Sequence, residues 1–423
     1  MIEAYTHHAL TPMKQAFDDS RWLRQTRDKR SIGIRKPSLY PAELRELAAT
    51  YFSLRTAASQ SDCPQGRRVL PTRVIWLRVL LVIGFPFMTG CGTVSYYAQA
   101  ARGQAELIWK RQRIEAVLAD SGQSETLKAR LRLVNALRQF ADEELDLPPG
   151  DSYTHYVALD RPMALWVVNA APEFSLELKS WWYPFVGRFE GRGFFNKEQA
   201  EDLADKLRKQ GYDVVVSGAP AYSTLGWFAD PVLSTFVNFN DADLAELIFH
   251  ELTHQRLYIS GDTAFNESFA TATAQVATLR WLGASGDGGA RDEYAASVKR
   301  LSRITRKLCA TREKLGVLYS QPLENAAMMR KLKASAFRNL RAELEIFQNE
   351  TGFSGAKKRP RIPMNNATLG SVAVYYKHVP AFRKLFENCN HRFPDYFKAV
   401  GRLGELPRGE RQRALKELRL AAP

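Results

Sequence analysis

The chain lacks an apolar run long enough for a comfortable transmembrane span. Its main apolar run, residues 79–88, is interrupted by Gly84 and Pro86, whereas a spanning helix needs about 20 apolar residues. No internal repeat is evident either. The 423 residues, of which 45% are hydrophobic and 11% aromatic, can instead bury a sizeable core and form one or two domains.

Cysteine is scarce, with four in the chain. Cys63 lies ahead of the apolar run, and Cys91 lies three residues beyond its end. Cys309 and Cys389 can either form a disulfide in an oxidising compartment or stay as two buried free thiols, and their spacing does not decide between these states. The chemistry of the chain therefore depends on other residue types.

Positive charge is abundant, with a formal net charge of +15, but it lacks the pattern that nucleic-acid binding requires. The basic run Lys357–Arg361 is short and contains no interleaved aromatic residue. We expect a solvated loop near anionic lipid or cell wall there, and no nucleic-acid partner.

One pentapeptide, His250-Glu251-Leu252-Thr253-His254, predicts a metal site. The apolar residues before it recur at helical spacing, and Asn240, Asp241 and Asp243 are candidate N-caps. Residues four apart on a helix share a face, so His250 and His254 can bind one ion. Glu251 can then reach a water bound to that ion. This pattern favours a zinc hydrolase over a pair of structural histidines.

One class of zinc site takes its third ligand from a histidine shortly after the HExxH pentapeptide, with a glycine between them. Here the positions of that glycine and histidine are occupied by Leu257 and Ser260, so this class is excluded. A glutamate from a following helix is the other solution. Ser260-Gly261 is expected to end the first helix, and a second is expected over Thr263–Leu282. Glu267 in its first turns is the predicted ligand, although it can also serve as an acid near a helix N-terminus.

Three residues near Glu267 have a possible supporting role. Asp262, Asn266 and Thr271 can hydrogen-bond the histidine ligands, or fill ordinary loop and cap positions.

Hydrophobic periodicity predicts further elements on both sides of the metal helix. The sequence predicts helices over Val94–Leu118, Glu125–Leu145, Lys197–Gln210 (capped by Asn196), Tyr294–Leu318, Leu323–Gln348, Leu369–Tyr376 and Ala381–Leu385, and strands over Tyr153–Leu159, Leu165–Asn169 and Tyr212–Val216. Tyr222–Phe228 is either an edge strand that pairs with an extended substrate or a core strand. The last helices are expected to close the cleft from the side opposite the metal helix.

The motifs resemble those of a family of predicted aminopeptidases, bacterial envelope lipoproteins grouped with the glutamate-type zincins. The resemblance rests on Phe185–Phe195, Pro220–Phe228, the HExxH pentapeptide, Asn266–Ala270, Asn365–Ala367 and Val379–Phe382. It implies one zinc ion on His250, His254 and Glu267, with Glu251 as general base and a peptide or protein as substrate. The Gly-x-Met-Glu-Asn signature that holds the substrate's ammonium group in a better-known zinc aminopeptidase family is absent.

The expected fold is α+β, a zincin-like metallopeptidase whose small sheet lies next to the HExxH helix. Mostly helical N- and C-terminal regions flank it. The predicted divisions are a disordered extension or mis-assigned start (1–73), a signal segment (74–90), N-terminal helices (91–150), a catalytic core (151–286) and a helical subdomain (287–423).

The apolar run before Cys91 indicates a lipoprotein signal. It follows basic residues and ends in Met88-Thr89-Gly90-Cys91, which resembles a lipobox with Met88 where leucine is usual. A lipid on Cys91 would anchor the protein to the membrane, facing the periplasm, and Gly92 suggests the outer membrane. The alternative is a cytoplasmic extension before a buried apolar strand.

A zinc peptidase also needs a donor for the oxyanion. Tyr375 is the first candidate, with Tyr376 and His378 as alternatives, because zincins of this type often use a tyrosine or histidine from a downstream helix. Two other functions remain open at this point. They are a hydrolase of peptidoglycan amides and a zinc-containing envelope binding or assembly protein without turnover.

Overall fold

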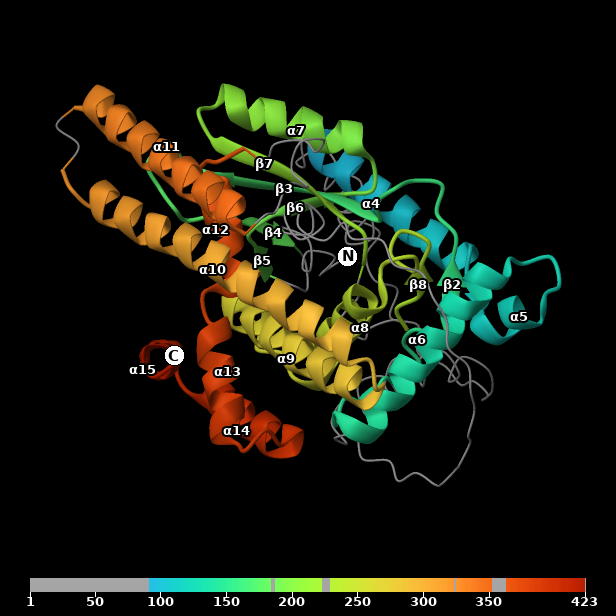
Figure 1. Cartoon of the computed structure of the whole chain (residues 1–423). Helices are drawn as coiled ribbons and strands as arrows, with labels where there is room; N and C mark the ends of the chain where they lie inside the picture. Colours follow the sequence, from blue (N-terminus) through green and yellow to red (C-terminus); the bar gives the residue numbers. More distant parts are fainter. Residues whose placement is uncertain (1–90, 184–186, 223–228, 323–324, 352–362, 423) are drawn as a thin grey trace, which may run out of the picture. The chain divides into compact units, whose positions relative to one another are not determined.

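The computed structural model describes residues 91–183, 187–222, 229–322, 325–351 and 363–422, and Figure 1 gives the labels of their elements. The helices are α4 Cys91–Trp109, α5 Ile114–Ala119, α6 Glu125–Glu144, α7 Lys197–Lys209, α8 Asp241–Arg256, α9 Thr263–Ala284, α10 Gly288–Tyr319, α11 Ala326–Glu350, α12 Asn366–Tyr376, α13 Val379–Asn388, α14 Phe393–Glu405 and α15 Arg408–Leu420. The strands are β1 Gln112–Arg113, β2 His155–Val157, β3 Leu165–Ala171, β4 Trp181–Tyr183, β5 Gly187–Phe189, β6 Arg192–Phe194, β7 Asp213–Ala219 and β8 Val232–Leu233. Every described residue from Ser95 onward belongs to one compact unit.

Most predicted elements are present within a few residues of their expected bounds. Ser124 caps α6 by accepting a hydrogen bond from Leu127 N, and Asn196 caps α7 in the same way from Gln199 N. These caps satisfy backbone donors that have no partner inside the helix. The predicted segments 1–73 and 74–90, most of Tyr222–Phe228 and the basic run Lys357–Arg361 lie outside the described residues.

The prediction of a single helix over Val94–Leu118 is wrong. α4 ends at Trp109, and Gln112 and Arg113 then form β1, which pairs antiparallel with Tyr156 and His155 of β2. The backbone N–H of Ile114 also donates to Thr154 O at 2.9 Å. Pairing with a distant strand thus interrupts a segment whose apolar spacing is helical.

The larger sheet has strand order β6-β3-β7, and both neighbours run antiparallel to β3. α7 packs along one side of β3 and β7, as Figure 1 shows, and α12 also contacts both strands. α12 in turn packs on α9. The sheet is therefore linked to α9 through one intervening helix.

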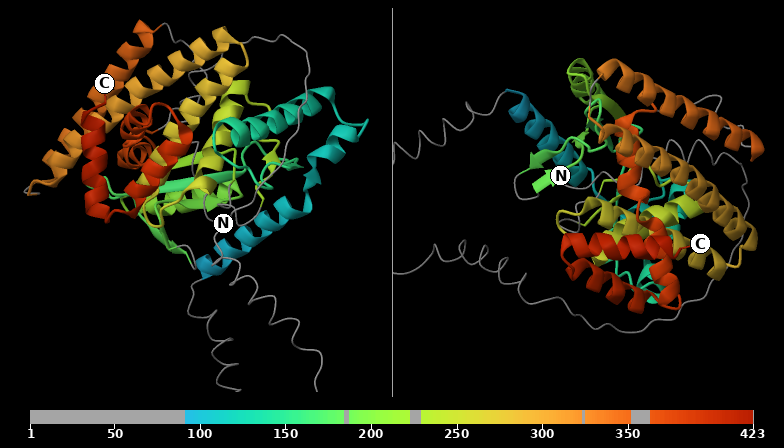
Figure 2. Two further views of the ribbon diagram at one scale, coloured as in Figure 1. Left: turned by 90° about the horizontal axis from the view of Figure 1, so that it is seen from below. Right: turned by 90° about the vertical axis from the view of Figure 1, so that its left-hand side faces the viewer.

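The main core lies around α8 and α9, which form an extensively packed pair. Leu244, Leu247 and Ile248 of α8 are fully buried with Phe265 and Phe269 of α9. The two helices are buried on several faces, since α6 covers α8 while α12, α13 and α10 contact α9. Figure 2 shows the C-terminal helices α13, α14 and α15 grouped beside this pair.

Small sheets and long helices together give an α+β composition in the described residues. None of the helices in these ranges is both long and apolar enough to span a membrane.

Candidate metal centre

The two histidines lie in the second half of α8, in its most buried stretch. Asn240 begins the helix by accepting a hydrogen bond from Asp243 N at 2.9 Å, as one of the predicted caps. From Leu244 to His254 every residue is buried. Because four residues complete about one turn, the two imidazoles lie one turn apart on the same face of the helix.

The loop between α8 and α9 differs from the expectation that Ser260-Gly261 ends the first helix. α8 ends at Arg256, and Leu257 is extended. The side chain of Asn266 accepts from Ile259 N and donates to Ile259 O, both at 2.8 Å. These bonds replace the helical partners of Ile259. Gly261 instead takes a left-handed turn, with φ of 78°, directly before α9.

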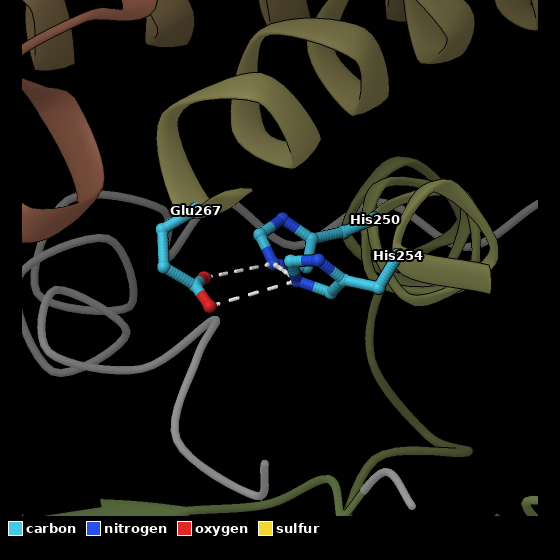
Figure 3. A group of neighbouring side chains, drawn as sticks. All are labelled: His250, His254 and Glu267. Carbon is cyan, nitrogen blue, oxygen red and sulfur yellow. Dashed lines mark hydrogen bonds and ion pairs between the residues drawn. The ribbon is translucent and has the colours of Figure 1, made fainter. Parts of the chain in front are cut away.

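The second helix brings the third side chain to the histidines. Asp262 caps α9 by accepting from Phe265 N, and Glu267 follows in the second turn. Figure 3 shows the carboxylate of Glu267 pointing at both imidazoles, which come from the neighbouring helix.

The donor atoms of these three side chains have the spacing of metal ligands. The Nε2 atoms of His250 and His254 are 3.1 Å apart. Glu267 Oε2 lies 3.4 Å from His250 Nε2, and Glu267 Oε1 lies 3.7 Å from His254 Nε2. Ligand atoms about 2.0–2.1 Å from a tetrahedral zinc ion lie about 3.3–3.4 Å from one another. One ion fits at the centre of this group.

Burial supports the same conclusion. His250 and Glu267 are 0% exposed and His254 is 3% exposed. Burial raises the pKa of Glu267 well above its ordinary value, because a carboxylate without water or donors is costly to ionise. Within the described ranges neither oxygen of Glu267 has a hydrogen-bond partner. A cation between the carboxylate and the imidazoles would compensate this charge, so His250, His254 and Glu267 can hold a metal ion.

The predicted general base, Glu251, is also buried, with 2% exposure, and stands beside His250 in the sequence. Burial raises the pKa of Tyr153 well above its ordinary value, and the negative charges of Glu251 and Asp230 raise it further. Tyr153 therefore lies within electrostatic reach of Glu251.

Sequence reasoning missed Tyr153 as a residue of this site. Its backbone is left-handed, with φ of 60°, and its N–H donates to Asp230 O at 2.6 Å. The preceding Ser152 accepts a hydrogen bond at 3.0 Å from Gln255, the neighbour of His254 on α8. No local motif indicated this, because the loop reaches α8 only through tertiary contacts.

The candidate oxyanion donors lie on α12 and at its junction with α13. The backbone N–H of His378 donates to Ser268 Oγ at 3.2 Å, and Ser268 directly follows Glu267. Burial lowers the pKa of the His378 imidazole to about 4, and the charge of Lys377 contributes. Tyr375 is buried and Tyr376 partly buried. The catalytic roles of these three residues stay predictions.

The residues considered for support of the histidines have mainly structural partners. Asp262 caps α9 and forms an ion pair with Arg411 at 2.8 Å, while Asn266 holds Ile259. Thr271 is buried in α9. Cys91 is the first residue of α4, and its predicted lipidation stays a prediction.

Comparison with known proteins bears on this arrangement. A family model described as "Putative aminopeptidase" matches residues 95–415. The chain belongs to this aminopeptidase family. The match contains α8, α9 and all three possible metal ligands, and it supports a hydrolase that acts as a peptidase. No curated protein and no solved structure matches the chain.

Proposed function

We propose that the protein is a zinc-dependent peptidase of the bacterial cell envelope. The observation that carries the proposal is the spacing of the His250, His254 and Glu267 donor atoms, 3.1–3.7 Å apart in a buried group. Membership of the aminopeptidase family supports the peptidase activity.

The donor set favours zinc over other common ions. Two imidazole nitrogens and one carboxylate oxygen are the three-ligand set of many catalytic zinc sites, whereas Mg²⁺ and Ca²⁺ prefer oxygen ligands throughout. Zinc held there would supply a Lewis acid for the scissile carbonyl and lower the pKa of a coordinated water to about 7.

Glu251 supplies the acid–base chemistry in this proposal. It accepts a proton from the attacking water and returns it to the amine of the leaving product. Its 2% exposure keeps the carboxylate away from bulk solvent, and its position directly after His250 in α8 is the one from which the proposed base would reach a water at the ion. A closed structural site would have no use for this residue.

The remaining groups stabilise charge and position the substrate. Tyr375 is the proposed donor to the oxyanion, with Tyr376 and His378 as alternatives on the same segment. A zincin-like arrangement of the sheet and the HExxH helix, cleavage at the N-terminus of the substrate and a lipid anchor on Cys91 facing the periplasm are further parts of the proposal.

One pair of variants on the same helix tests the proposal. Glu251 and Glu246 are both buried at 2% exposure, but Glu246 accepts a hydrogen bond from Tyr294 at 2.6 Å and stands one turn before the ligands. Glu251→Gln should bind one zinc ion per chain and lower peptide cleavage by about 100-fold to 10,000-fold. Glu246→Gln should retain both.

The measurements are elemental analysis of the purified chain and cleavage of a peptide library with free and with acetylated N-termini. Loss of cleavage on acetylation would support N-terminal specificity. Full activity of Glu251→Gln would remove this residue from catalysis. Stoichiometric zinc with no cleavage by the wild type would contradict the peptidase itself.

A further inference from the structure

A cavity of about 400 Å³ lies among four helical segments away from the metal ligands, none of which lines it. Its walls come from α10, from the α12–α13 segment, from the C-terminal end of the chain and, through Gln275, from α9. Gln275 is eight residues beyond Glu267, which corresponds to about 12 Å along a helix. This volume is within the usual range of small-molecule sites.

The polar lining of the cavity is strongly basic. Five cationic side chains, Arg306, Lys377, Arg383, Lys384 and Arg419, line it with a single carboxylate, that of Glu387. Glu387 is already paired with Lys384 at 3.2 Å, and Arg419 pairs with Glu313 at 3.2 Å. Within the described parts of the chain, no acidic side chain forms an ion pair with the other three cations.

The guanidinium of Arg383 is held by one hydrogen bond and has a further N–H donor without an acceptor in the described ranges. Its Nη2 donates to Gln275 Oε1 at 2.7 Å, which holds the guanidinium against α9. Its Nε is buried and has no acceptor in the described ranges. A buried donor without an acceptor costs free energy unless a ligand or water supplies one. Arginine also suits phosphate oxygens well, since its donors form a planar fork.

Lys377 lies close enough to other positive charges for them to affect its ionisation. Burial lowers its pKa, and the positive charges of Arg312 and Arg419 lower it further. These like charges are held together by the packing of α10, α12 and α15, and an anion in the cavity would relieve their repulsion.

Part of the lining is apolar. Val298 and Leu301 of α10 and Val379 and Pro380 of α13 contribute to the walls. A bare phosphate ion would occupy only a small part of a cavity of about 400 Å³. The space therefore fits a phosphate group that carries a compact organic body.

We propose that this basic cavity is a binding site for a phosphate monoester, held by Arg383, Lys377 and Arg306. The shared chemistry belongs both to small soluble metabolites and to an anionic lipid headgroup. The site does not depend on the metal centre or on the proposed peptidase activity.

The test measures binding of glycerol 3-phosphate to the full chain by calorimetry. Inorganic phosphate and neutral glycerol serve as further probes. A second arm measures flotation of the protein with vesicles of phosphatidic acid in phosphatidylcholine, against phosphatidylcholine alone. Binding of the soluble monoester assigns the site to metabolites. Binding confined to the charged vesicles assigns it to a lipid headgroup.

Matched variants separate the cavity from general positive charge. The double variant Arg306→Gln/Lys377→Gln should weaken binding at least tenfold. The control Arg341→Gln/Lys398→Gln removes two exposed cations outside the cavity and should bind within twofold of the wild type. Arg383→Gln is the sharper change, and circular dichroism checks that each variant folds.

The proposal fails if the wild type binds neither glycerol 3-phosphate nor charged vesicles. It also fails if both double variants lose binding equally, since the attraction would then be unspecific.

Discussion

Two buried carboxylates at the start of α9, Asp262 at its N-cap and Glu267 in its second turn, have opposite kinds of partner. Asp262 and Glu267 are five residues apart and are 3% and 0% exposed. Arg411 donates to Asp262 Oδ2 through Nε at 3.0 Å and Nη2 at 2.8 Å, and Phe265 N donates to Oδ1. Glu267 has imidazoles beside it and no hydrogen-bond donor in the described ranges.

This is the difference expected between a structural acid, Asp262, and the proposed metal ligand, Glu267. A buried carboxylate that serves the fold is satisfied by protein donors, as Asp262 is. A buried carboxylate that faces only histidines, as Glu267 does, is expected to take a cation from solution as its partner. Substitutions at Glu267, at Arg411 and at the buried His378 should separate the two kinds of buried group.

The largest effect is expected from Glu267→Ala. Removing one of three ligands should lower zinc affinity by more than 100-fold, and peptide cleavage should fall with it, because the ion loses its only anionic ligand. Competition with a zinc chelator measures the affinity, and the cleavage assay measures activity.

The matched change is Glu405→Ala, an exposed acid at the end of α14. It should leave both quantities unaltered. Zinc affinity within threefold of the wild type in Glu267→Ala would show that this side chain is not a ligand.

Arg411→Leu should act on stability instead. It leaves Asp262 buried without its cation and also removes the bonds from Arg411 Nη1 to Gly404 O and Leu406 O. Breaking a buried pair in this way costs about 3–5 kcal/mol. Urea unfolding of the purified protein measures the loss.

Arg413 is exposed on the same helix and provides the control as Arg413→Leu, which should change stability by less than about 0.5 kcal/mol. Below its unfolding transition, Arg411→Leu should still bind one metal ion per chain. Equal stability of the two leucine variants would contradict the structural role of the Asp262–Arg411 pair.

A smaller effect is expected from His378 and depends on pH. Burial lowers the pKa of this imidazole from 6.5 to about 4, so the unfolded chain takes up a proton at higher pH than the folded one. The stability associated with neutral His378 is present above pH 6.5 and is lost as the pH falls towards 4. At about 1.4 kcal/mol per pKa unit the loss approaches about 3 kcal/mol.

His378→Gln should remove that part of the acid sensitivity. The side chain of His378 forms no cap bond to α13, so the substitution leaves the start of the helix unaltered. Unfolding free energies of both proteins at pH 7.5 and pH 4.5 provide the measurement, with the exposed His391→Gln as control. An unchanged slope with pH in His378→Gln would refute the assignment.

Local sequence rules accounted for much of the framework. The helix caps Asn196 and Asn240 were identifiable because the capping side chain lies three residues before the backbone donor that it satisfies. The histidine pair on α8 was identifiable for a similar reason, since helical spacing alone fixes two histidines on one face.

The local rules failed where contacts outside the local segment determine the backbone conformation. β1 interrupts an apolar helical pattern because it pairs with β2. α8 ends before Ile259 because the side chain of Asn266 forms hydrogen bonds with the N–H and the carbonyl of Ile259. β2 is distant from β1 in the sequence, and Asn266 acts on Ile259 through its side chain from seven residues further on. A propensity scale includes neither contact, so these contacts overrode the local preference.

The sequence by itself determined that two imidazoles lie on one helical face with a glutamate between them, because a helix has a fixed period. Only the tertiary structure decided that Glu267 faces both imidazoles, that Tyr153 lies near Glu251 and that five cationic side chains line one cavity. These arrangements depend on how separate helices pack, and packing is determined by the whole core rather than by any short segment.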